Sequence, residues 1–533
     1  MSLFKSAATI SGLTFLSRIT GLARDIIIAR AFGASALTDA FWVAFRIPNL
    51  LRRLFAEGAF SQAFVPIMGV YKEQHEEAEV KELINMVTLI LGATLLIVSI
   101  LGAIFAPFIV TIMASGIARE GGQPFDAAIW MTRIMFPYIF CMSLVALASG
   151  VLNTWRKFAI PAFTPILLNL SMIGSALFLV RYFELPIYAL AVGVMIGGFL
   201  QLATQWIALA KIGMLPRPSL RFKEAWQNST VRRIITLMGP ATIGVSVAQI
   251  SLLINTNIAT WLPRGSVSWL SFADRLMEFP TALLGIALGT VLLPTLAAAH
   301  ANNDHQRYSQ LMDWGLRLIC LLGLPCMVGL ALLSDGLVAS LFNYGAFSSH
   351  DVAQTQMAVI AYGFGILGIL AVKILAPGFY AKQDIRTPVK IAIIVLVLTQ
   401  VMNLFLVPLL QHSGLALSIG LGATINALLL YRGLRQRNIY QPSGGWLRFF
   451  IRLLPALVLM ALWLLLCGQL IEWSQDSSSG LIYTLSQQWG IFGSASFVVW
   501  RLVTLMAVLL ASILIYFGSL FVFGFRVRNF FNR

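Results

Sequence analysis

The sequence predicts an all-α integral membrane protein with about fourteen transmembrane helices. Three observations carry this prediction: 59% of the 533 residues are hydrophobic, only 11% are charged, and apolar runs recur along the whole chain. Soluble domains carry about 25% charged residues. No polar stretch here is long enough to form a separate soluble domain.

The expected helices follow from the lengths of the apolar runs, because a membrane span needs roughly 20 mostly apolar residues. The expected spans cover residues 5–31, 36–69, 83–113, 127–153, 159–181, 186–210, 232–262, 267–299, 310–342, 352–380, 388–410, 413–434, 448–472 and 497–523. The first two are the least hydrophobic, because they hold charged residues.

The loops between these spans predict the orientation. Lys and Arg gather in alternate loops and in the C-terminal tail, and such loops are typically cytoplasmic. We therefore expect both termini in the cytoplasm and an even number of spans. The net charge of +16 is explained by these loops, so it does not indicate nucleic-acid binding.

The first twelve spans form two similar halves. Gly33 and Gly265 stand 232 residues apart, and so do Pro48 and Pro280. An offset of six spans predicts two parallel six-helix lobes, which is a transporter architecture. Two further helices follow the repeat. The expected domains are residues 1–211, 230–437 and 447–525.

Charged and polar residues inside the weak spans are the candidate binding site. They are Arg18 and Arg24 in the first span, Asp39, Asn49, Arg52, Arg53 and Glu57 in the second, and Asp274, Arg275 and Glu278 in the eighth. An arginine near mid-bilayer costs roughly 2.5–3.5 kcal/mol, so such residues normally face a watery cavity or a counter-charge. A guanidinium group suits phosphate because its planar fork donates two parallel hydrogen bonds. The pattern therefore predicts a cationic cavity and an anionic ligand.

Simpler explanations stay open for these residues. Asp25, Asp39, Glu57, Asp274 and Glu278 can neutralise most of the arginines, which would leave no charge for a ligand. Two arginines, at positions 52 and 53, lie near the end of their span and can serve as interfacial anchors.

Other polar residues in the spans have weaker functional signals. The asparagines within spans are expected to form hydrogen bonds between helices. They are Asn169, Asn255, Asn257, Asn403 and Asn426. Lys373 is a candidate for a cavity or for ion coupling. The five histidines fall at loops or span ends and no nucleotide-binding motif is present, so we expect no metal, no cofactor and no direct use of ATP.

Two motifs closely resemble the bacterial lipid II flippase family, MurJ, also called MviN. They are SRITGLARDIIIARAFGASALTDAFWVAFRIPNLLRRLFAEGAFSQAFVPI at 17–67 and SFADRLMEFPTALLGIALGTVLLPTL at 271–296. The resemblance implies the fold of the multidrug/oligosaccharidyl-lipid/polysaccharide exporter superfamily. It also implies that residues 447–525 form a groove for a lipid tail.

The resemblance implies a function in cell-wall synthesis. The substrate would be lipid II, an undecaprenyl-diphosphate disaccharide pentapeptide, moved from the inner to the outer leaflet of the cytoplasmic membrane for peptidoglycan synthesis. The cavity arginines of the family match Arg18, Arg24, Arg52 and Arg275 here, with Asp39, Glu57 and Glu278 as acidic neighbours. Transport in the family is linked to membrane potential, which implies a coupling monovalent ion as one partner. The membrane lipids are another.

Alternating access around the arginine cavity is therefore the expected mechanism, without catalysis. The alternatives are a flippase for another polyprenyl-diphosphate-linked glycan, a drug antiporter, a membrane enzyme acting on polyprenyl diphosphates and a membrane scaffold. A positive cavity does not suit an antiporter that carries cations. An enzyme needs a metal-binding carboxylate pair or a histidine base close to the cavity, and the sequence offers neither there. A scaffold leaves the buried arginines without a purpose.

Overall fold

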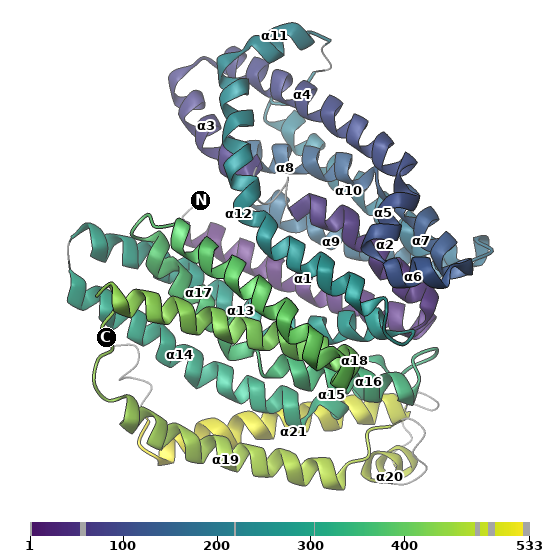
Figure 1. Ribbon diagram of the computed structural model, residues 1–533, viewed down its shortest axis with the longest axis vertical. Helices are drawn as coiled ribbons and strands as arrows, with labels where there is room; N and C mark the ends of the chain where they lie inside the picture. The colour runs from purple at the N-terminus through teal and green to yellow at the C-terminus, as the bar shows by residue number, and fades with distance from the viewer. Residues whose placement is uncertain are drawn as a thin grey trace. The chain divides into compact units, whose positions relative to one another are not determined.

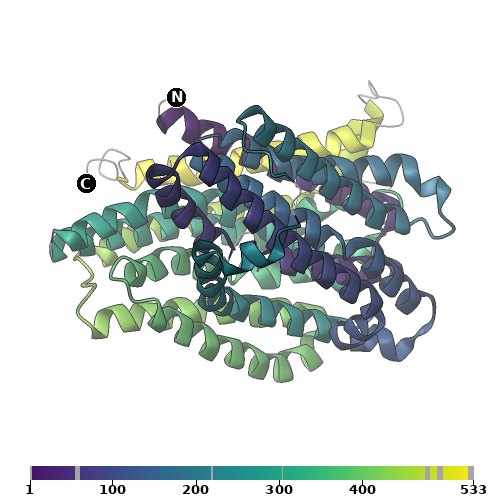
Figure 2. The ribbon, with the colours of Figure 1, turned by 90° about the horizontal axis from the view of Figure 1, so that it is seen from above.

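The computed structural model describes residues 3–53, 60–217, 220–302, 304–474, 480–488 and 496–525. These residues form helices and loops with no strand, which confirms the all-α fold (Figures 1 and 2). The chain divides into two compact units, Met1–Ser268 and Trp269–Arg533.

Among its described residues, unit 1 contains twelve α-helices and the first turn of a thirteenth. Their bounds are α1 Leu3–Phe32, α2 Ala36–Arg52, α3 Ser61–Gln74, α4 Glu77–Ile104, α5 Ala106–Met113, α6 Ser115–Glu120, α7 Gly122–Met135, α8 Tyr138–Thr154, α9 Ala159–Gly174, α10 Tyr188–Lys211, α11 Phe222–Gln227, α12 Ser229–Ala259 and α13 Ser266–Ala301. A π-helical turn (Ser175–Leu179) and a 3-10 turn (Val180–Tyr182) extend α9.

Small residues let the helices of unit 1 approach closely. The helix pairs α9 with α10, α1 with α9 and α2 with α7 pack side by side (Figure 1). A Cβ added to Gly193 would lie 2.7 Å from the Ser175 hydroxyl, and one on Gly198 would lie 2.7 Å from the Tyr138 ring. Without a hydrophobic driving force in lipid, such close backbone packing is what holds membrane helices together.

Local signals set where the helices begin. Gly33 takes a left-handed φ of 62°, and Ser35 then caps α2 by accepting a hydrogen bond from the Thr38 N–H. Gly265, its counterpart in the predicted repeat, also has a positive φ, of 98°, immediately before α13. Asn228 caps α12 through the N–H groups of the two residues that follow Ser229.

Unit 2 contains the rest of α13 and eight further helices among its described residues. Their bounds are α14 His305–Leu332, α15 Ser334–Phe342, α16 Ser349–Gly363, α17 Ile366–Tyr380, α18 Arg386–Gln436, α19 Trp446–Leu470, α20 Leu481–Gln488 and α21 Ser496–Val522.

Helix α18 is long because it runs through two predicted spans. Gln411 interrupts it with φ 52° and ψ −130°, three residues after Pro408. A Cβ on Gly414 would lie 2.2 Å from the Leu406 carbonyl oxygen, so only glycine fits at this sharp bend. The bend lies where the sequence predicts the loop between residues 410 and 413.

Close packing also ties α17 to α18. A Cβ on Gly365 would lie 2.3 Å from the Cα of Gly420. At the start of α19, the buried Asp313 of α14 accepts hydrogen bonds from the Ser443 N–H at 2.6 Å and from the Trp446 indole at 3.2 Å. These bonds fasten α19 to α14, and α19 in turn packs along α21 (Figure 1).

Nine helical segments within the described ranges are long and apolar enough to cross a membrane. They match ten of the predicted spans, because α18 covers two, and the other four correspond to α1, α2, α12 and α13. The count of fourteen and the domains 1–211, 230–437 and 447–525 stay predictions. Helix α12, expected in the second lobe, belongs to unit 1 and packs against α3.

Candidate functional site

Arg24 lies buried in α1 beside its own counter-charge. Its Nε and Nη2 are 2.8 and 2.7 Å from Oδ1 of Asp25, and its Nη1 donates to Oδ1 of Asn169 at 3.1 Å. The amide of Asn169 donates back to the Ser17 carbonyl and to Thr20 of α1, each at 3.1 Å. This is the neutral pairing that the sequence left open, and it fastens α1 to α9.

The side chain of Asp39, which belongs to α2, caps the N-terminus of α13. Its Oδ2 accepts from the Gly265 N–H at 2.6 Å, and its Oδ1 accepts from the N–H and hydroxyl of Ser268 at 2.8 and 2.6 Å. Gly265 has no side chain with which to cap α13. The buried carboxylate therefore supplies both bonds of a capping box and places its charge at the helix N-terminus.

The other polar residues of α2 and the segment after it are partly described. Arg46 is half-buried and donates to the Thr256 hydroxyl of α12, and Asn49 is half-buried one turn further on. Arg53 follows the end of α2 and is exposed. Two predicted binding groups, the side chain of Arg52 and all of Glu57, lie outside what the structure describes.

The eighth predicted span places an ion pair on a partly open surface of α13. The Arg275 Nη1 is 2.7 Å from the Glu278 Oε2, and their side chains are 22% and 33% exposed. Asp274 is exposed beside them, while Arg18 of α1 is half-buried. An ion pair that water can reach is able to exchange its carboxylate for another anion, and guanidinium has five donors for the purpose.

Lys373 joins α17 to α13. Its Nζ donates to the Thr281 carbonyl at 2.9 Å. The Lys373 side chain also lies against Gly285, where an added Cβ would come 2.4 Å from Nζ. The predicted interhelical role of asparagine is confirmed at Asn169 and also at Asn257. The latter accepts from Ser115 at 2.9 Å and donates to the Ile112 carbonyl at 2.5 Å.

Further arginines inside predicted spans escaped the sequence reasoning, Arg501 and Arg133 among them, although the same rule on charge in apolar segments would have found them. Arg501 of α21 is 0% exposed and donates to the Asn343 carbonyl and the Trp473 carbonyl, both at 3.1 Å. Its guanidinium also lies 4.6 Å from the centre of the Tyr344 ring. The second, Arg133 of α7, borders a cavity in unit 1.

Asp384 lies in the turn between α17 and α18, outside the predicted spans. The Thr387 N–H and hydroxyl donate to its carboxylate at 3.0 and 2.7 Å, and Arg437 pairs with it. Burial raises the pKa of this carboxyl, but these hydrogen bonds outweigh burial and bring the pKa below its ordinary 3.8. Among the described residues, no group of three His, Cys, Asp or Glu side chains is placed to hold a metal ion.

Known proteins resemble this chain over its whole length. The sequence profile described as "Lipid II flippase MurJ" matches residues 28–485. The lipid II flippase MurJ of Burkholderia cenocepacia is 50% identical over 533 residues, covering 100% of both chains. The probable lipid II flippase MurJ of Vibrio cholerae is 37% identical, covering 99% of this chain and 97% of the relative.

Solved structures agree on the fold. A lipid II flippase MurJ in an inward closed conformation superposes with a TM-score of 0.75 at 24% identity, covering 96% of this chain and 97% of the other. An inward-facing multidrug resistance MATE transporter of the MOP superfamily gives 0.66 at 13% identity, covering 81% and 98%. The resemblance found in the sequence is confirmed: the chain belongs to the lipid II flippase MurJ family.

Proposed function

We propose that this chain is a lipid II flippase, which moves the undecaprenyl-diphosphate-linked precursor from the inner to the outer leaflet of the bacterial cytoplasmic membrane. The observation that carries the proposal is the 50% identity over the full length of a relative named for that activity. The process is transport, so no residue is assigned a catalytic role.

The diphosphate of the substrate is recognised, in this proposal, by guanidinium groups that already hold an exchangeable carboxylate. Arg275 is the strongest candidate, because its partner Glu278 is one-third exposed and lies one turn away on the same helix. Binding of the diphosphate replaces Glu278 on Arg275, and Glu278 returns when the ligand leaves. Arg18, half-buried on α1, is the second candidate, with Asp274 as an acidic neighbour of Arg275.

The remaining members of the predicted set divide by their surroundings. Arg24 and Asp39 act as positioning residues, because Arg24 is paired with Asp25 and Asp39 caps α13. The other four, Asn49, Arg52, Arg53 and Glu57, are proposed as further polar groups along the substrate path.

The substrate moves by alternating access, with both termini of the chain in the cytoplasm. A coupling monovalent ion and the membrane potential drive the cycle. Moving one charge through 100 mV is worth about 2.3 kcal/mol, enough to favour the return of an empty cationic carrier. The polyprenyl tail stays in lipid along residues 447–525.

The test is lipid II translocation in proteoliposomes that contain the full chain. Arg275→Ala and Arg18→Ala should each abolish most translocation while the protein still inserts. Arg264→Ala is the matched control, because Arg264 pairs with Glu120 at 3.3 Å on an exposed surface. Normal translocation by both cavity variants would show that the site is wrong. No translocation by the unmodified chain would show that the function is wrong.

A further inference from the structure

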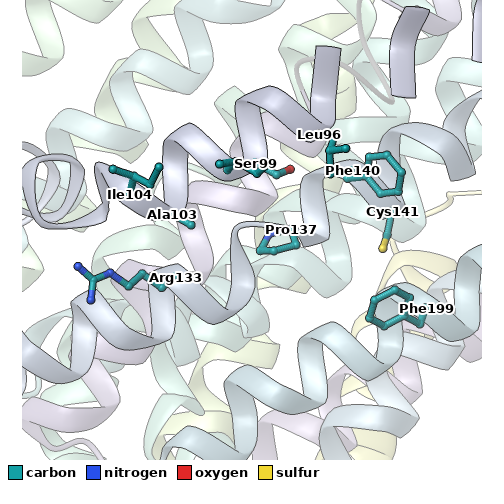
Figure 3. A pocket seen from close by; sticks show the side chains of 10 residues that line it. Leu96, Ser99, Ala103, Ile104, Arg133, Pro137, Phe140, Cys141 and Phe199 are labelled. Atoms are coloured by element: carbon teal, nitrogen blue, oxygen red, sulfur yellow. The ribbon is translucent and has the colours of Figure 1, made fainter. Parts of the chain in front are cut away.

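Unit 1 contains a mostly apolar cavity of about 690 Å³ that the flippase proposal does not use. It lies between α4, the α7–α8 junction and α10 (Figure 3). Its size falls within the range of roughly 300–1,000 Å³ typical of ligand pockets. None of its lining residues belongs to residues 447–525, for which the family resemblance implies a lipid-tail groove.

Small and helix-breaking residues lie where the helices around the cavity meet. A Cβ on Gly102 would lie 1.8 Å from the Phe136 ring, so α4 presses on the end of α7 at this point. Pro137 separates α7 from α8, since it has no N–H to continue the helical hydrogen bonding. Ala103, whose side chain is a single methyl group, leaves room above the junction.

The walls of the cavity suit a hydrocarbon chain. Leu96, Ile100 and Ile104 follow one another along α4 and, with Phe199 of α10, are each more than half exposed. From Leu96 to Ile104 the helix advances about 12 Å. All of the bordering helices are among those able to cross a membrane, so this elongated apolar hollow opens toward lipid.

One end of the hollow carries a cation. Figure 3 shows Arg133 at one end of the lining side chains and Phe199 at the other, with Pro137 and Ser99 between them. The guanidinium lies 5.1 Å from the ring centre of Trp130, which is itself exposed. Within the described part of the chain, no carboxylate lies within ion-pair distance of Arg133.

A second polar group faces the hollow. Ser99 is 3% exposed and lines the cavity, and its hydroxyl has no hydrogen-bond partner among the described residues. Arginine and tryptophan together are typical of the membrane interface, where they meet lipid headgroups. An arginine in apolar surroundings needs a counter-charge, and a lipid phosphate provides one with bidentate geometry.

We propose that this hollow binds one anionic glycerophospholipid, with an acyl chain along Leu96–Ile104 and the phosphate on Arg133. A zwitterionic lipid offers the same chain and phosphate but adds a cation beside the guanidinium, so the site prefers a lipid with net negative charge. By the orientation predicted from the loops, the lipid belongs to the outer leaflet, the side of the membrane on which α4 ends.

The test is lipid binding to the purified full chain, measured by native mass spectrometry. Phosphatidylglycerol and phosphatidylcholine with identical acyl chains are the probes. The unmodified chain should bind phosphatidylglycerol about ten-fold more tightly, the scale of one charge-assisted contact. Arg133→Gln should remove the preference. Arg181→Gln is the matched control, because Arg181 lies at the same 5.1 Å from an aromatic ring, Tyr182, away from the cavity.

A second variant tests the acyl chain separately. Ala103→Phe fills the hollow and should weaken binding of both lipids, and Ala103→Leu serves if the larger residue impairs folding. Equal binding of the two lipids by the unmodified chain would overturn the proposal, as would an unchanged preference in Arg133→Gln. Retention of undecaprenyl diphosphate in place of phosphatidylglycerol, dependent on Arg133, would also overturn it.

Discussion

Asp39 provides the sharpest test of how the first turn of α13 is held. In Asp39→Ala, the N–H groups of Gly265 and Ser268 lose their acceptor at a buried position, whereas the Ser268 hydroxyl can rotate to another partner. An unpaired buried donor costs about 1–3 kcal/mol. The two N–H groups therefore predict a loss of about 2–6 kcal/mol in the free energy of unfolding.

Thermal unfolding of the purified chain measures this loss. At roughly 2 °C per kcal/mol for a unit of this size, Tm should fall by about 4–12 °C. Asp39→Asn keeps an oxygen for Ser268 but turns its NH₂ toward the Gly265 N–H, so it should fall between the alanine variant and the unmodified chain. Ser268→Ala removes one hydroxyl and should cost about 1 kcal/mol. A Tm for Asp39→Ala within about 1 °C of the unmodified chain would refute the capping role.

Three other predictions concern stability. Gly365→Ala should lower Tm strongly, because its Cβ would lie 2.3 Å from the backbone of α18, whereas Gly468→Ala, with nothing within 4 Å, should not. Arg24→Ala should cost about 3–5 kcal/mol by removing one partner of a buried ion pair with Asp25; adding Asp25→Ala should restore part of the loss, and a further fall would contradict the pairing. Asp384 contributes stability above the ordinary pKa of 3.8 and loses it as pH falls through its lowered folded pKa. Asp384→Asn should thus lower Tm more at pH 7 than at pH 3, and equal effects at both would contradict this.

Hydrophobicity and backbone chemistry made much of the fold predictable. Span length located α4 and α10, and the bend at Gln411 fell between two predicted spans. These features are local: an apolar run of fixed length or a proline acts within a few residues of its own position. The family followed from two long motifs for the same reason.

The site was less predictable because its partners are distant in sequence. The residues near Asp39 in the sequence do not indicate that its carboxylate oxygens accept hydrogen bonds from Gly265 and Ser268. These two residues are 226 and 229 positions away. Its place in a weakly hydrophobic span indicated a binding role for Asp39, but the missing cap of α13 determined what it binds. Arg133 was not among the predicted site residues, because that prediction used the charged residues of the least hydrophobic spans. The span that contains Arg133 is strongly apolar.

In the proposed mechanism, Arg275 exchanges Glu278 for the diphosphate of the substrate. The most direct measurement is the affinity of the full chain for lipid II, compared between Arg275→Ala and Glu278→Gln. We predict that Arg275→Ala weakens binding about ten-fold or more, as expected for loss of a charge-assisted pair, whereas Glu278→Gln binds as well as the unmodified chain or more tightly. Equal weakening by both variants would mean that the pair only supports the helix and would contradict the account.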